Sequence, residues 1–136
     1  MFKIDKPLPA ITEDGAPYWA AAREGRLEMP RCTACAQYAW PPSNVCPKCL
    51  GTQLEWVPLS GQGTIYSFIV VHRPQHPAFL EDAPYNVAIV ELDEGPRLHG
   101  NVVECENAEL TIGSPVEVVF DAVDDEVTLP KFRLRR

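Results

Sequence analysis

The 136-residue chain has few histidines, few basic residues and no long apolar run. Its three histidines, His72, His76 and His99, are not linked by any motif to an activated serine or cysteine, so we expect no catalytic residue here. No apolar stretch is long enough to cross a bilayer, so we expect no membrane contact. Residues 1–7 lack the apolar core of a secretory signal, which favours a cytoplasmic protein whose thiols stay reduced.

Positive charge is also in short supply. Lysine and arginine total 12 against 19 acidic residues, which gives a net charge of -7. Phosphate contacts supply most of the affinity of nucleic-acid-binding proteins, so this balance argues against a nucleic-acid partner. A hydrophobic content of 46% is sufficient for a packed core.

The most informative residues are four cysteines in two Cys-x-x-Cys pairs, Cys32 with Cys35 and Cys46 with Cys49. Each pair closes a tight turn that directs two thiolates at one point, and two such turns form a tetrahedral site of four sulfurs, the kind Zn²⁺ prefers. Four protein ligands leave no open coordination position, so we expect a structural Zn²⁺. Two disulfides are the alternative to a metal, and iron is the alternative metal because the same ligands suit it.

The fifth cysteine, Cys105, lies in the stretch Val102–Glu106, where a buried strand thiol is the default expectation. A catalytic pairing of Cys105 with His99 stays open at this point, because only the fold decides whether the two side chains meet. We prefer the structural interpretation.

The pattern along the chain predicts a mainly β protein with a short N-terminal helix, a four-cysteine zinc ribbon and a five-stranded OB-fold barrel. We assign residues 1–28 to an N-terminal extension and helix, 29–56 to the ribbon and 57–136 to the barrel. The helix is expected over Asp14–Arg26, with Tyr18 and Trp19 packing either on the zinc ribbon or on a partner. The strands are expected at 64–72, 85–92, 97–103, 116–120 and 129–136.

The order of several short motifs resembles a known family. The chain reads R-C-x-x-C, W-P-P, C-P-x-C, S-G-x-G-T-I-Y-S-F, P-Y-N-V-A-I-V-E-L-D-E-G, R-L-H-G-N-V-V, I-G-S-P-V-E-V-V-F and L-P-K-F. This order, which extends from about Tyr18 to Phe132, resembles the OB-fold proteins with a rubredoxin-like zinc ribbon that accompany thiolase-superfamily enzymes.

The resemblance implies an accessory subunit of a heteromeric thiolase, acyltransferase or retro-aldolase complex that acts on a CoA thioester, as in aromatic or steroid side-chain degradation. The catalytic residues would lie on the partner. From the family we carry over only the metal ligands, Cys32, Cys35, Cys46 and Cys49.

Contact of this chain with CoA is a further expectation. The candidates are His72 and Arg73, which lie at the start of a proline-rich loop, and Arg133 and Arg135 in a basic C-terminal segment with Lys131 and Arg136. Arginine suits phosphate because its planar fork binds bidentately, although a solvated tail is the simpler interpretation.

Two rival functions follow from the same modules. Zinc ribbons and OB-folds also occur in proteins that bind single-stranded nucleic acid, in which Tyr66, Phe68 and Tyr85 would stack on bases, and the acidic strand region argues against that function. An iron centre held by four sulfurs would instead transfer electrons and colour the protein red, but the chain lacks the glycine-rich second knuckle of rubredoxins.

Overall fold

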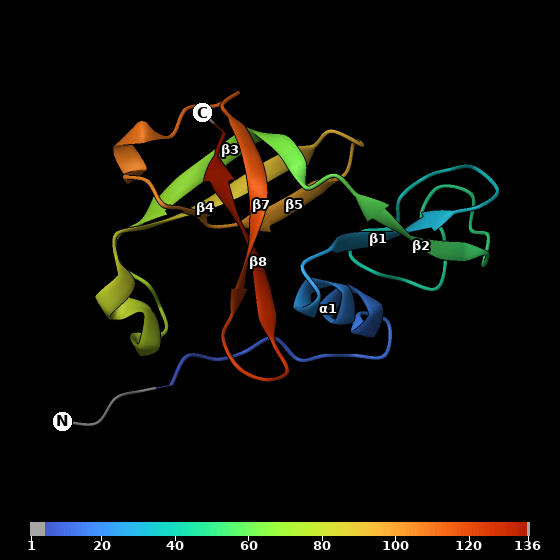
Figure 1. The fold of residues 1–136 in the computed structure, drawn as a ribbon, viewed down its shortest axis with the longest axis horizontal. Coiled ribbons are helices and arrows are strands. Elements are labelled where there is room, and N and C mark those ends of the chain that lie inside the picture. Colours follow the sequence, from blue (N-terminus) through green and yellow to red (C-terminus); the bar gives the residue numbers. More distant parts are fainter. Residues whose placement is uncertain (1–4, 136) are drawn as a thin grey trace.

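The computed structural model describes residues 5–135, so Arg136, which the sequence places in the last strand, and residues 1–4 lie outside the described part. A small β-hairpin projects from one side of a curved sheet, and a short helix lies beneath the junction of the two (Figure 1). Within residues 5–135, no helix has the length and apolar character needed to span a bilayer. The elements in chain order are α1 (Ala16–Arg23), β1 (Leu27–Cys32), β2 (Leu54–Leu59), β3 (Gln62–Val71), η1 (Pro77–Asp82), β4 (Tyr85–Leu92), β5 (Arg97–Gly100), β6 (Val102–Val103), η2 (Asn107–Glu109), β7 (Pro115–Ala122) and β8 (Thr128–Leu134).

Helix α1 is shorter than the sequence pattern predicts. It begins with a proline in its first turn, where a missing N–H costs little, and it ends at Arg23 instead of continuing to Arg26. Gly25 has a φ of +78°, and the amides of Gly25 and Arg26 donate to the carbonyl oxygens of Ala22 (3.0 Å) and Ala21 (2.9 Å). This Schellman arrangement terminates the helix and sends the chain into β1. Leu27, directly after the expected helix, is therefore the first residue of β1.

Tyr18 resolves the two alternatives for the helix in favour of packing within the chain. Its ring is buried and lies 4.7 Å from the ring of Trp40 in the ribbon and 5.0 Å from Trp19. Helix α1 also contacts β1, β7 and β8. The helix therefore joins the ribbon to the barrel, while Trp19 stays partly exposed.

The ribbon is built on an antiparallel pair, β1 and β2, that runs in register from Leu27 opposite Leu59 to Cys32 opposite Leu54. The sequence pattern does not single out β1 as a strand, because Pro30 and Arg31 interrupt its alternation. Its last residue is a predicted metal ligand. The hairpin thus holds the first knuckle at its far end.

The barrel has the strand order β5-β4-β3-β7-β8-β6. Strands β5 and β6 are consecutive parts of one extended segment that leaves β4 near Gly100 and pairs in parallel with β8, with Val102 opposite Phe132. The amide of Phe132 also donates to the carbonyl oxygen of Asn101 (2.9 Å). Counted this way the barrel has five strands and closes on itself, which confirms the expected OB-fold architecture.

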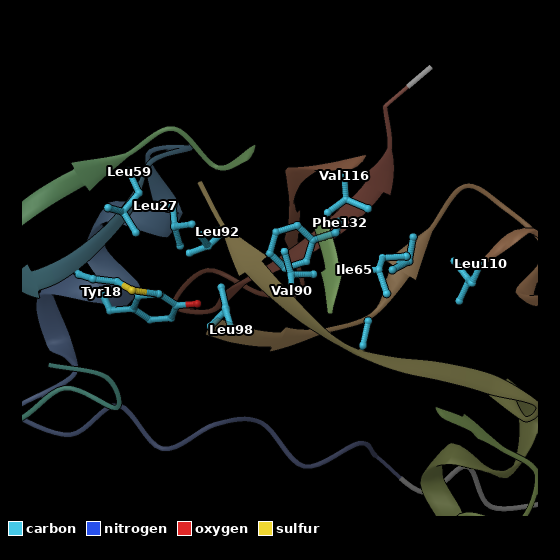
Figure 2. Close-up of a cluster of buried hydrophobic side chains, with 13 residues drawn as sticks. Tyr18, Leu27, Leu59, Ile65, Val90, Leu92, Leu98, Leu110, Val116 and Phe132 are labelled. Carbon is cyan, nitrogen blue, oxygen red and sulfur yellow. The ribbon is translucent and has the colours of Figure 1, made fainter. Parts of the chain in front are cut away.

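The core runs without interruption from the ribbon into the barrel. Figure 2 shows its side chains pointing toward one another from the helix, the hairpin and the barrel strands. The cluster includes Tyr18, Leu27, Met29, Leu59, Ile65, Val90, Leu92, Leu98, Val116 and Phe132. The two modules are therefore one packed body.

A bulge in β3 changes which residues face this core. Ile65 pairs with Val90 and is buried, but Tyr66 is an extra residue, and the next pair joins Ser67 to Ile89. The side chains beyond the bulge exchange faces, so Ile69 is 62% exposed. We expected one simple continuous strand at 64–72. The bulge divides it into two parts, in which alternate residues point to opposite faces of the sheet.

Candidate metal centre

The first knuckle is a tight turn from Cys32 to Gln37. The amide of Ala36 donates to the carbonyl oxygen of Cys32 (2.9 Å), and the amide of Cys32 donates to the carbonyl oxygen of Gln37 (2.8 Å). Ala36 takes a left-handed conformation with a φ of 64°. These contacts fold the backbone so that Cys32 and Cys35 project to the same side.

The second knuckle repeats this backbone arrangement. The amide of Leu50 donates to the carbonyl oxygen of Cys46 (3.0 Å), and the amide of Cys46 donates to the carbonyl oxygen of Gly51 (2.8 Å). Leu50 occupies the position of Ala36, with a φ of 62°. Two loops of unrelated sequence thus adopt one geometry, which is what a pair of metal-binding knuckles requires.

The structure brings the four predicted thiols together. All four Sγ atoms lie within 4.8 Å of one another. Cys32 Sγ lies 3.6 Å from Cys49 Sγ, and Cys35 Sγ lies 3.5 Å from Cys46 Sγ. A Zn–S bond of about 2.3 Å gives a sulfur–sulfur edge of about 3.8 Å in a regular tetrahedron. The cage therefore fits one metal ion with four thiolate ligands.

The thiols are not electrostatically equivalent. The amides of Cys49 and Lys48 point at Cys46 Sγ (3.5 and 3.4 Å) and lower the pKa of Cys46 to about 6. The amide of Gln37 lowers the pKa of Cys35, but burial and the neighbouring sulfurs outweigh it and raise that pKa to about 11. Sulfurs this close resist sharing several negative charges, so a full set of thiolates requires a bound cation.

The loop candidates for CoA contact lie away from this centre. His72 and Arg73 are both exposed and follow β3, at the start of the segment that leads to η1. A cavity of about 540 Å³ between the first knuckle and the β4–β5 turn has neither residue in its lining. It is lined by Ala36, Gln37, Tyr38, Trp40, Glu94, Gly95, Pro96 and Arg97.

The C-terminal candidates are held in β8 and just beyond it. Arg133 bonds Glu117 (2.9 Å) and lies 3.9 Å from Glu104, so its charge is already neutralised by two carboxylates. Arg135 is exposed and donates to the side-chain oxygen of Gln62 (3.1 Å). The two arginines therefore differ in how readily their guanidinium groups could bind a phosphate.

The open pairing of Cys105 with His99 gains no support from the positions of the two residues. His99 projects outward from β5 and is exposed, whereas Cys105 is partly buried and packs against the core cluster. The expectation of a buried strand thiol was wrong in detail, because Cys105 lies in a bend after β6 and is only partly buried.

Sequence reasoning missed three residues that shape the fold, two of them at the centre and one in the barrel. Ala36 and Leu50 close the knuckles, and the signal was their position directly after each Cys-x-x-Cys pair. Asn86 is a buried polar residue whose side chain bonds both the amide (2.7 Å) and the carbonyl oxygen (2.8 Å) of Val102. A lone asparagine in an apolar strand was the signal there.

Two family models together match most of the chain. The model described as "ChsH2, rubredoxin-like zinc ribbon domain" matches residues 19–55. The model described as "ChsH2, C-terminal OB-fold domain" matches residues 56–121. The order of the two matches is the order of the modules in the structure.

A solved structure titled "Ltp2-ChsH2(DUF35) aldolase" contains a chain with a closely similar fold. The TM-score is 0.84 at 43% sequence identity, and the match covers 93% of this chain and 98% of that chain. Fold and sequence therefore agree over almost the whole of both chains.

Curated proteins show the same relationship. A Thermomonospora curvata protein named "Probable enoyl-CoA hydratase alpha subunit" is 44% identical over 131 residues, which cover 96% of this chain and 40% of that protein. The present chain thus spans less than half the length of that relative. The Thauera aromatica "Benzoylsuccinyl-CoA thiolase subunit BbsA" is 30% identical over 118 residues, covering 79% of this chain and 72% of that protein. The chain belongs to the ChsH2 (DUF35) family, in which a rubredoxin-like zinc ribbon precedes an OB-fold domain.

Proposed function

We propose that this chain is a zinc-containing accessory subunit of a thiolase-like enzyme complex that acts on a CoA thioester. The observation that carries the proposal is the similarity of this chain to a chain of the Ltp2-ChsH2(DUF35) aldolase, which covers 93% of this chain and 98% of the other. The thiolase subunit from Thauera aromatica supports the same class of complex. The catalytic groups lie on the partner, and the complex is cytoplasmic.

We assign Cys32, Cys35, Cys46 and Cys49 as the ligands of one structural Zn²⁺. The sulfur–sulfur separations and the closed set of four thiols support this assignment. The role of the metal is to fold the ribbon, because a hairpin of this size gains much of its folding free energy from metal binding. Elemental analysis should find one zinc per chain in a colourless protein, and a red protein holding iron would contradict the assignment.

Within this function, CoA is a ligand shared with the partner. Both arginines are exposed, and Arg135 is better suited than Arg133 because it bonds a neutral amide whereas Arg133 lies against two carboxylates. His72 and Arg73, just beyond the end of β3, are the other two candidates. Arg135→Ala should weaken acyl-CoA binding by the complex, with Arg97→Ala as a control arginine that pairs with Glu91. Equal affinities in the two variants would remove Arg135 from the site.

The decisive experiment is co-purification of the tagged chain from its host, followed by mass spectrometry of the companion. A thiolase-superfamily protein in stoichiometric yield is expected, and the two separately produced proteins should then form a complex on size-exclusion chromatography. A chain that elutes alone under conditions in which the candidate partner is folded would overturn the accessory-subunit function.

A further inference from the structure

The four metal ligands differ in their exposure to solvent. Cys32 and Cys46 are buried, with exposed fractions of 1% and 0%, and Cys35 is half-buried. Cys49, the last of the four, is exposed. A small oxidant that attacks a cysteine needs both access to the sulfur and an ionised thiol. Because a bound metal ion ionises all four thiols, access selects among them, and Cys49 is the most accessible ligand.

Cys49 also has a second thiol within reach, on the opposite knuckle. Its Sγ lies 3.6 Å from Sγ of Cys32, and the other two ligands, Cys35 and Cys46, form a similar pair with their Sγ atoms 3.5 Å apart. The sulfurs of a disulfide are separated by about 2.05 Å, so the first pair closes through a shift of about 1.5 Å. An accessible thiolate with a resolving thiol beside it is typical of cysteines that respond to oxidants.

We propose that Cys49 is an oxidation site at which hydrogen peroxide opens the metal centre, with Cys32 as the resolving thiol. The Cys49 thiolate attacks one peroxide oxygen, so an S–O bond forms, the O–O bond breaks and hydroxide leaves. The Cys32 thiolate then attacks the Cys49 sulfur, so an S–S bond forms, the S–O bond breaks and a second hydroxide leaves. Peroxide is thus reduced by two electrons, and two thiolates are oxidised to one disulfide. This inference goes beyond the accessory function and rests on the assignment of zinc to the four thiols.

The oxidised centre no longer holds its metal. Two ligands are consumed, and the remaining pair, Cys35 and Cys46, offers Zn²⁺ two protein ligands in place of the four of a structural site. Because metal binding supplies much of the folding free energy of the ribbon, the oxidised chain should lose zinc and melt at a lower temperature. Tyr18 transmits this loss to the barrel, since it belongs to the core that the ribbon and the barrel share. A reductant with added Zn²⁺ should restore both properties, because disulfide formation is reversible.

The order of disulfide formation tests the proposal in the unchanged chain. The zinc-loaded protein is treated with hydrogen peroxide, free thiols are blocked at intervals, and the links are mapped by tandem mass spectrometry. A Cys32–Cys49 disulfide should appear first and in step with zinc release, which a chromophoric chelator reports. A Cys35–Cys46 disulfide should follow only with further peroxide. A first disulfide within one knuckle, or first oxidation at Cys105, would overturn the proposal.

A matched pair of ligand substitutions tests the entry point of the oxidant. Histidine can replace cysteine as a zinc ligand but forms no disulfide. Cys49→His should therefore keep zinc in the reduced protein and release it to peroxide at least about tenfold more slowly, because the accessible thiolate is gone. Cys35→His makes the same change at the equivalent position of the other knuckle and keeps the Cys32–Cys49 pair, so its release rate should stay within about threefold of the unchanged chain. Equal slowing in the two variants would remove Cys49 as the entry point. If either variant fails to bind zinc, the disulfide map of the unchanged chain decides.

The outcomes separate the oxidation site from the zinc assignment on which it rests. If the reduced chain holds zinc and peroxide releases it without forming the Cys32–Cys49 disulfide, or releases none, the oxidation site is wrong and the zinc assignment stands. If the reduced chain holds no zinc, the assignment fails and the inference fails with it. Neither result depends on complex formation, so the accessory function is tested independently.

Discussion

The ring of Tyr18 lies 4.7 Å from the ring of Trp40, and this contact joins the N-terminal helix to the zinc ribbon. Tyr18 belongs to the same buried cluster as Leu92 and Leu98 of the barrel. The ribbon, the helix and the barrel therefore share one core, and a change in the ribbon should be felt by the rest of the chain.

Loss of the metal should lower the stability of the whole chain. Cys46→Ser removes a thiolate ligand, so the ribbon loses the free energy of zinc binding that folds it. Because Tyr18 spans the ribbon and the barrel, we expect the main melting transition to shift downward as well. Thermal melting with and without a chelator measures this.

Cys105→Ser is the control for that experiment, because it changes a cysteine outside the thiol cluster. It should leave both the zinc content and the effect of the chelator unchanged. Identical melting curves for the protein with and without chelator would contradict the structural role of the metal.

Asn86→Ala should destabilise the barrel where the segment formed by β5 and β6 passes from its pairing with β4 to its pairing with β8. The substitution leaves the amide and the carbonyl of Val102 without the side-chain partners that the structure gives them. Each of the two buried groups left unpaired costs about 1–3 kcal/mol, so we expect a total loss of about 2–6 kcal/mol. Urea unfolding at equilibrium measures the change.

Asn107→Ala is the matched comparison for Asn86→Ala. Asn107 accepts from the Asn86 amide (3.0 Å) and donates to the carbonyl oxygen of Pro84 (3.1 Å) in an exposed setting. Its loss should cost about 1 kcal/mol. A larger loss for Asn107 than for Asn86 would show that the loop, and not the strand crossing, limits stability.

Gly100→Ala should introduce a steric conflict with Phe132 at the barrel closure. A Cβ at position 100 would lie 3.1 and 3.2 Å from two carbon atoms of the Phe132 ring. Overpacking of this kind costs about 1–3 kcal/mol. Equilibrium unfolding of Gly100→Ala, Phe132→Leu and the double variant gives the coupling free energy between the two sites. We expect the double variant to lose less stability than the sum of the two single losses. Additive losses would mean that the ring does not restrict position 100.

Tyr18 should make stability depend on alkaline pH. Burial raises the pKa of Tyr18 well above its ordinary value, so the folded state keeps the phenol proton after the unfolded state releases it. The unfolded chain then binds fewer protons, and stability falls as the pH rises above about 10, the pKa of an unfolded tyrosine. Tyr18→Phe should lose this component, as denaturant unfolding at neutral and alkaline pH would show. An equally steep alkaline decline in Tyr18→Phe would assign it to other groups.

The metal centre could be predicted from sequence because its geometry is local. Each Cys-x-x-Cys pair is a single turn, and the four ligands fall between Cys32 and Cys49. The barrel strands could be predicted almost as well, because Tyr85–Leu92 alternates buried and less buried residues in register with its period of two. The family resemblance joined these pieces, and the similarity to the ChsH2 chain confirms it.

The end of the helix and the bulge in β3 could not be predicted with the same success. Leu27 fits a helical period as well as a strand, and the left-handed Gly25 decides between them. Nothing in the run from Ile65 to Ile69 marks Tyr66 as the extra residue. Which face of the sheet each later side chain of β3 points to depends on which residues of β4 pair with that part of β3.

The sequence by itself determined the kind of metal site and the positions of the barrel strands, because each depends on residues that are close together along the chain. It also determined the family, because the order of the motifs is a property of the sequence alone. Tertiary structure decided that Tyr18 is core, that Asn86 bonds Val102 across 16 positions, and that β6 closes the barrel on β8. It also decided that Leu50 is exposed. These outcomes depend on contacts between distant segments, and local pattern carries no record of which segments will meet.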